Sequence, residues 1–176
     1  MTNPLGAWLD DLTLPELQER LEGDAVFVVP VFAATVPPPW LPIRTGAAIA
    51  RAVAQRLVDR LPVIAMHEAP QQELTARAAA LQALGARRFA VLDAGFSGPA
   101  CAAAPAAAFV ARVAAGSTDA DDIDTSLMYA LDPRSIRAGL LPPSSRASAF
   151  TGERAMADAV ERIVAALLVR WPDLRA

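Results

Sequence analysis

The side chains best suited to acid–base or nucleophilic chemistry follow two predicted strands. His67, the single histidine, comes directly after one apolar run, and Asp93 follows another. Ser97 lies in the segment GFSGP at 95–99, which matches the nucleophile-elbow pattern G-x-S-x-G except that proline takes the place of the second glycine. Two hypotheses stay open: a hydrolytic triad of Ser97, His67 and Asp93, with His67 as general base, or a glycine-rich turn that only reverses the chain, with His67 on the rim of the sheet.

A second group of candidate residues is acidic. Asp119, Asp121, Asp122 and Asp124 stand within six residues, and their oxygens are ligands that a hard cation such as Ca²⁺ or Mg²⁺ prefers. The simpler interpretation makes Asp124 the N-cap of a helix over 125–131 and leaves the other carboxylates solvated near the positive end of that helix. We favour the helix cap.

Composition excludes several classes of function. The 176 residues include one histidine, one cysteine and no lysine, so a metal site with two imidazoles, a lysine Schiff base and a P-loop are all excluded. The net charge of -3, without a basic cluster, argues against a nucleic-acid partner. The N-terminus lacks the pattern of a signal peptide, and the apolar run 100–111 is too short to cross a membrane. We predict a cytoplasmic protein with no membrane contact and no cofactor.

The elements that must position these residues alternate between two periodicities. Short β-branched runs predict strands over 24–31, 63–66, 89–92 and 109–113, and four-residue periodicity predicts helices over 14–21, 45–60, 71–84, 125–131 and from about 151 to Pro172. We expect Pro30 to end the first strand and Thr45 to cap the following helix. The alternation predicts one domain over 1–176, a three-layer αβα fold with a mainly parallel sheet, and a site in loops 32–44, 93–99 and 114–124, where strands end.

Three blocks, in chain order, resemble one known family. The first joins Pro30-Val31 to Leu41-Pro42-Ile43, Thr45 and an alanine-rich helix; the second is LGARRFAVLDAGFSG at 84–98; the third is DADDIDTSLMYALDPRSIR at 119–137. The first block is similar to P-V-G-S followed by E-Q-H-G-x-H-L-P-L-x-T-D. The second is similar to G-F-R-R-I-V-L-V-N-G-H-G-G-N, and the third to H-A-G-x-x-E-T-S-L-M-L-A-L-x-P-x-L-V-R. These are motifs of the creatininase family, which comprises creatinine amidohydrolases and related metal-dependent amidases. The resemblance covers nearly the whole chain and implies the creatininase fold.

The resemblance also implies where a catalytic centre would lie. Members of the family hold two divalent metals through carboxylates and histidines of these blocks. The positions that correspond to the ligands and their neighbours are Thr35, Pro37, Trp40, Gly46, Gly95, Asp119 and Asp124. Proline, glycine and tryptophan have no side-chain donor for a divalent ion. We therefore predict no metal site.

The resulting hypothesis is a creatininase-like pseudoenzyme that acts as a binding, scaffold or regulatory subunit. It predicts self-association or pairing with an active relative or a biosynthetic protein. Trp40 then either packs over the end of the sheet, filling the space of the lost metals, or stays exposed as part of an interaction surface. Two alternatives are a metal-independent hydrolase using Ser97 and His67, and a small-molecule sensor at the strand ends.

Overall fold

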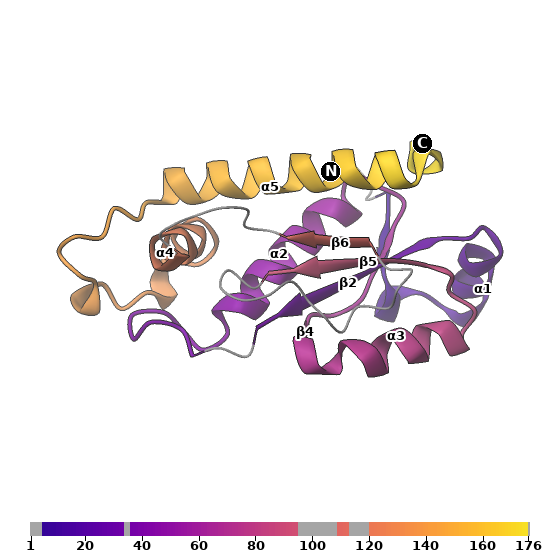
Figure 1. Ribbon diagram of the computed structural model, residues 1–176, viewed down its shortest axis with the longest axis horizontal. Helices are drawn as coiled ribbons and strands as arrows, with labels where there is room; N and C mark the ends of the chain where they lie inside the picture. Colours follow the sequence, from indigo (N-terminus) through magenta and orange to yellow (C-terminus); the bar gives the residue numbers. More distant parts are fainter. Residues whose placement is uncertain (1–4, 34–35, 95–108, 113–119, 176) are drawn as a thin grey trace.

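The chain folds into three layers, with a parallel sheet between two layers of helices, as Figure 1 shows. The computed structural model describes residues 5–33, 36–94, 109–112 and 120–175. The strands are β1 (Ala7–Trp8), β2 (Val26–Phe32), β3 (Ile64–Ala65), β4 (Ala69–Pro70), β5 (Arg88–Asp93) and β6 (Phe109–Arg112). The helices are α1 (Leu14–Glu22), α2 (Thr45–Val58), α3 (Leu74–Ala83), α4 (Ala120–Leu131) and α5 (Ala149–Arg170). The predicted fold class is confirmed.

The sheet separates two apolar cores. Its order is β1-β3-β2-β5-β6, with β4 also beside β2, and every pair is parallel. Alternate residues of β2 and β5 point to opposite faces, as strand geometry requires. Val28 and Leu92 pack with α2, α4 and α5, whereas Phe27 and Val91 pack with α1 and α3. In Figure 1 the sheet accordingly lies between α5 and α3.

The central strand β2 contains a proline, and the sheet is adapted to it. The prediction that Pro30 ends the strand is wrong, because two further residues of β2 follow it. Val28 pairs with Ala65 of β3, and Val31 pairs with Ala69 of β4. Between these two pairs β2 advances by three residues, whereas the chain beside it advances by four. That extra residue is a bulge beside Pro30. Pro30 has no N–H, and the ladder is already interrupted where this donor would have been used.

The helix α2 confirms its predicted apolar stripe but begins differently. Ile49, Val53 and Leu57 are fully buried. Thr45 is not the N-cap, which is Arg44; Thr45 is the first helical residue, and its hydroxyl donates to the Pro42 carbonyl at 2.7 Å. The hydroxyl thus closes the turn before the helix rather than capping the helix's own amides.

The helices α4 and α5 pack at very close range. A Cβ atom at Gly152 would overlap the carbonyl oxygen of Ser126, so only glycine lets the two backbones approach this far. The Ser126 hydroxyl donates to the Asp122 carbonyl and accepts the Ser148 N–H at 3.2 Å, which fixes the start of α5 against α4. The predicted stripe of α5, including Met156 and Leu167, is buried.

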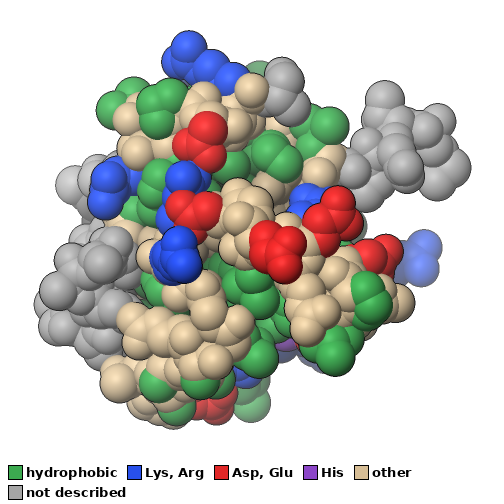
Figure 2. Space-filling model, turned by 90° about the vertical axis from the view of Figure 1, so that its right-hand side faces the viewer, with side chains coloured by type: hydrophobic (Ala, Val, Ile, Leu, Met, Phe, Trp, Pro, Cys, Tyr) green, Lys and Arg blue, Asp and Glu red, His purple; other side chains and the backbone are tan. Residues whose placement is uncertain are grey.

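One face of the molecule is mixed in charge. Figure 2 shows arginine and acidic side chains interspersed on the face that carries α1 and the end of α5. Arg88, for example, pairs with Asp24 at 2.7 Å and with Asp173 at 2.6 Å. Among the described helices, none combines the length and the apolar character needed to cross a membrane.

Candidate functional site at the carboxyl ends of the strands

Asp93 ends β5 at the edge where ligands bind in parallel sheets. Its side chain is buried, with 1% of the residue exposed, and it accepts a hydrogen bond from the Gln71 side-chain amide at 2.8 Å. Gln71 opens the short 3-10 turn Gln71–Glu73 that leads into α3. The Asp93 carboxylate therefore joins the sheet to the α3 layer.

His67 lies on the β1 side of the sheet and has partners that the triad hypothesis does not include. Its Nε2 is 2.9 Å from the Asp10 carboxylate, and its ring stacks on Trp8 with centroids 5.5 Å apart. Its Nδ1 is 3.4 Å from an Arg51 guanidinium nitrogen. The carboxylate that contacts the imidazole is thus that of Asp10. Ser97 and Gly95 lie outside the described residues, so the triad as a whole stays a prediction.

Trp40 packs against the core rather than standing free. It is half-buried beside the cluster formed by α2, α4 and α5, and its indole N–H donates to the Thr125 hydroxyl at 2.9 Å. Thr125 is fully buried and donates in turn to the Asp121 carbonyl. The Trp40 carbonyl accepts the Arg137 N–H at 2.9 Å. These contacts agree with the packing interpretation of Trp40.

Gly46 lies where the first turn of α2 meets the end of β2. A Cβ atom placed there would be 3.1 Å from the Cβ of Phe32, which is tighter than ordinary van der Waals contact. The resemblance puts a metal-binding aspartate at this position. Here the backbone of α2 approaches the strand so closely that any side chain must push against Phe32.

Asp124 is the remaining carboxylate among the described ligand positions. The prediction that it caps a helix over 125–131 is wrong, because α4 begins at Ala120 and Asp124 lies inside it. Burial, and secondarily the nearby Asp121 carboxylate, raise the pKa of Asp124 to about 7. Its Oδ1 is buried and has no hydrogen-bond partner among the described residues.

The prediction that the other carboxylates of this acidic segment are solvated is also wrong for Asp122. It accepts hydrogen bonds from the Ser145 hydroxyl at 2.6 Å and from the Arg146 N–H at 3.0 Å. These bonds, the Ser145 contact first, hold the pKa of Asp122 below its usual value. Asp122 therefore anchors the segment between α4 and α5.

A dinuclear metal centre does not fit the described residues. Pro37, Trp40 and Gly46 offer no side-chain donor, and Asp124 has only one carboxylate to contribute. In the described part of the chain no three side chains of His, Cys, Asp or Glu converge as ligands. Thr35 and Asp119 lie outside that part.

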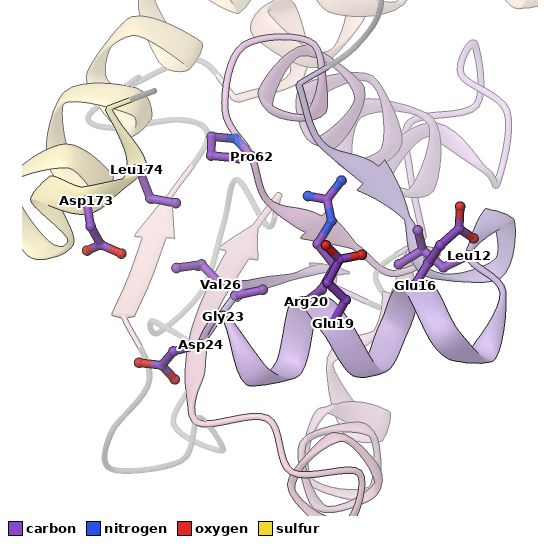
Figure 3. Close-up of a pocket in the computed structure, with 11 residues that line it drawn as sticks. Leu12, Glu16, Glu19, Arg20, Gly23, Asp24, Val26, Pro62, Asp173 and Leu174 are labelled. Carbon is purple, nitrogen blue, oxygen red and sulfur yellow. The ribbon is translucent and has the colours of Figure 1, made fainter.

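An acidic cavity lies at the opposite end of the sheet. It has a volume of about 560 Å³ and is lined from α1, the start of β2 and the C-terminal turn, as Figure 3 shows. Three of its four carboxylates already have partners: Glu16 accepts from the Thr13 N–H and hydroxyl, and Asp24 and Asp173 pair with Arg88. These contacts, including the predicted capping box of α1, give the cavity a structural explanation.

A second cavity, of about 510 Å³, lies along the outer face of α2. Arg51 of α2 and Glu68, which follows β3, line it together with the end of α4. Sequence reasoning did not find this pair, because Arg51 appears only as a solvent-facing helix position and Glu68 only as part of a short connection. The one signal available was that Glu68 follows a strand end.

Comparisons with known proteins identify the fold. No family model matches the chain, and no curated protein sequence matches it. Solved structures match over nearly all of both chains. An alanine variant of creatininase has a TM-score of 0.79 at 16% identity, covering 95% of this chain and 99% of that one. A glutamine variant described as the Zn-Zn type gives 0.77 at 16%, covering 97% and 100%. Creatinine amidohydrolase (creatininase) itself gives 0.73 at 15%, covering 97% and 99%. The fold is therefore creatininase-like.

Proposed function

We propose that this creatininase-like fold serves binding and does not carry out metal-dependent amide hydrolysis. The observation that carries the proposal is the close approach of Gly46 to the Phe32 side chain: the position where the resemblance puts a metal-binding aspartate has no side chain, and a Cβ atom there would lie 3.1 Å from the Phe32 Cβ. We further propose that the protein works in the cytoplasm, as a subunit that associates with itself or with another protein.

Two other contacts support the proposal. The Trp40 indole, at the position of the motif's second histidine beside the ligands, is engaged by Thr125, so this side chain has a packing role. Asp124, at a ligand position, is buried with a pKa of about 7, so close to neutral pH a large fraction of its carboxyl groups is protonated and a metal would have to displace that proton.

Metal content and amidase activity test the proposal together. Protein purified without chelator, then incubated with Zn²⁺ or Mn²⁺ and desalted, should carry well under one equivalent of metal by elemental mass spectrometry. It should not hydrolyse creatinine above a buffer blank. Stoichiometric metal accompanied by creatinine hydrolysis would overturn the proposal.

Native mass spectrometry tests the association. Protein at micromolar concentration should appear as an oligomer, or as a complex after co-purification from its host. A monomer in both preparations would contradict the proposed subunit role while leaving the prediction of metal-free protein intact.

A further inference from the structure

We propose that the groove on the outer face of α2 binds a free α-amino acid with an apolar side chain, and that Arg51 and Glu68 hold its charged head group. The inference deepens the proposed binding function by giving it a ligand class and a site. The groove is formed by the N-terminal half of α2, the residues after β3 and the end of α4.

The two head-group residues stand side by side with opposite charge. An Arg51 guanidinium nitrogen is 3.8 Å from Glu68 Oε2, too far for a hydrogen bond. The Glu68 side chain is only 20% exposed, and its buried Oε2 has no hydrogen-bond partner among the described residues. A buried carboxylate oxygen left in this state is costly, and a donor that reached it would recover that cost. An ammonium group is such a donor.

Arg51 is held in place before any ligand arrives. Its guanidinium lies over the Trp8 ring, 5.4 Å from the centroid, and His67 Nδ1 is 3.4 Å away on another side. Trp8 is itself fixed, because its indole N–H donates to Gln55 at 2.8 Å. A guanidinium with few alternative rotamers loses little entropy on binding, and its planar fork matches a carboxylate.

The rest of the groove suits an apolar side chain. Its floor consists of Ala47, Ala48 and Ala52 of α2, with Leu131 of α4 beside them. At the far end Arg44 and Asp132 form an ion pair at 2.5 Å, so their charges are already matched. The volume of about 510 Å³ falls within the usual range for small-molecule sites.

The balance of charge selects the ligand class. A phosphate or other simple anion bound at Arg51 would also face Glu68, and a simple cation bound at Glu68 would face Arg51. A zwitterion with neighbouring carboxylate and ammonium groups satisfies both residues at once, which is electrostatic complementarity. An α-amino acid has these two groups on one carbon, with the side chain directed away from them.

Calorimetric titration with L-leucine and two analogues tests the inference on the intact protein. Leucinamide lacks the carboxylate, and 4-methylpentanoate lacks the ammonium group. We expect saturable binding of L-leucine and binding at least about tenfold weaker for each analogue. If L-leucine, L-methionine and L-phenylalanine all fail to bind at about 10 mM, or if either analogue binds as well as L-leucine, the inference is overturned.

Substitutions locate the site. Arg51→Gln and Glu68→Gln should each weaken L-leucine binding at least about tenfold, whereas Arg154→Gln and Glu153→Gln, exposed on α5, should leave it unchanged. Unchanged affinity in both groove variants would overturn the assignment. If a groove variant does not fold, the analogue series on the unmodified protein decides. Metal content, measured on the same samples, tests the proposed function separately, because amino-acid binding on α2 does not depend on it.

Discussion

At the scale of single residues, Asp124 makes the stability of the protein depend on pH. Its carboxyl group has an ordinary pKa of 3.8 and a pKa of about 7 in the fold, so the folded state holds a proton that the unfolded chain releases between about pH 4 and pH 7. The free energy of unfolding therefore decreases as pH rises through this window. Below pH 4 both states are protonated and the effect is absent.

The substitution Asp124→Asn removes this effect, because an amide stays neutral. We expect a gain of about 1–3 kcal/mol in the free energy of unfolding at pH 8, and little change at pH 4, measured by urea denaturation. Asp158→Asn, at an exposed position of α5, is the control and should leave the pH profile unchanged. An equal loss of stability between pH 4 and pH 8 in Asp124→Asn and in the unmodified protein would show that another group is responsible.

Trp40 allows a second prediction at this scale. The substitution Trp40→Phe removes the indole N–H and leaves the Thr125 hydroxyl without that donor, although Thr125 is fully buried. We expect a loss of about 1–2 kcal/mol in the free energy of unfolding. Thr125→Val provides the double-mutant cycle: the two substitutions together should cost less than the sum of their separate effects. Strict additivity would mean that the bond contributes nothing.

At the scale of elements, the crossing of α4 and α5 depends on Gly152. The substitution Gly152→Ala places a methyl group on the Ser126 carbonyl, and the helices must separate. We expect a loss of about 2–4 kcal/mol in the free energy of unfolding, by chemical denaturation. Gly139→Ala is the matched control, because a Cβ atom there meets nothing within 4 Å. Similar effects of the two substitutions would contradict the close packing.

The long elements could be predicted from the sequence, and the short ones could not. Val26–Phe32 and the buried stripe of α5 have enough residues for periodicity to appear, and Gly85 has the left-handed φ of 99° that ends the predicted helix over 71–84. The strands β1 and β4 have two residues each, too few for any pattern. The start of α4 was missed because aspartates before Thr125 are also typical of a cap.

In the candidate sites, too, some residues could be predicted from the sequence and others could not. The strand-end positions followed from the resemblance, because they come in fixed order within three blocks. Arg51 and Glu68 come together only through tertiary packing, in which Trp8 of β1 and the segment after β3 meet the outer face of α2. No local pattern contains that information. Asp10, the carboxylate beside His67, is also distant in sequence and was missed for the same reason.

At the scale of the whole molecule, the proposed function predicts that stability is independent of metals. A structural or catalytic metal adds its binding free energy to the folded state, so its removal lowers Tm. We expect the same Tm, by differential scanning calorimetry, in the presence of EDTA, of Zn²⁺ and of neither. A Tm that falls with EDTA and recovers with Zn²⁺ would require a site that the described residues do not form.

The bulge beside Pro30 has an effect beyond the sheet. Pro30 has no N–H to offer the neighbouring strand, and between the pairs Val28–Ala65 and Val31–Ala69 that neighbour has one residue more than β2, within the stretch from Met66 to Glu68. Glu68 belongs to this stretch, and its carboxylate lies 3.8 Å from the Arg51 guanidinium of α2. Replacing the ring of Pro30 by valine would restore an N–H at this point of β2, and we expect the stretch to straighten and Glu68 to move away from Arg51, which the L-leucine titration would register as weaker binding in the groove.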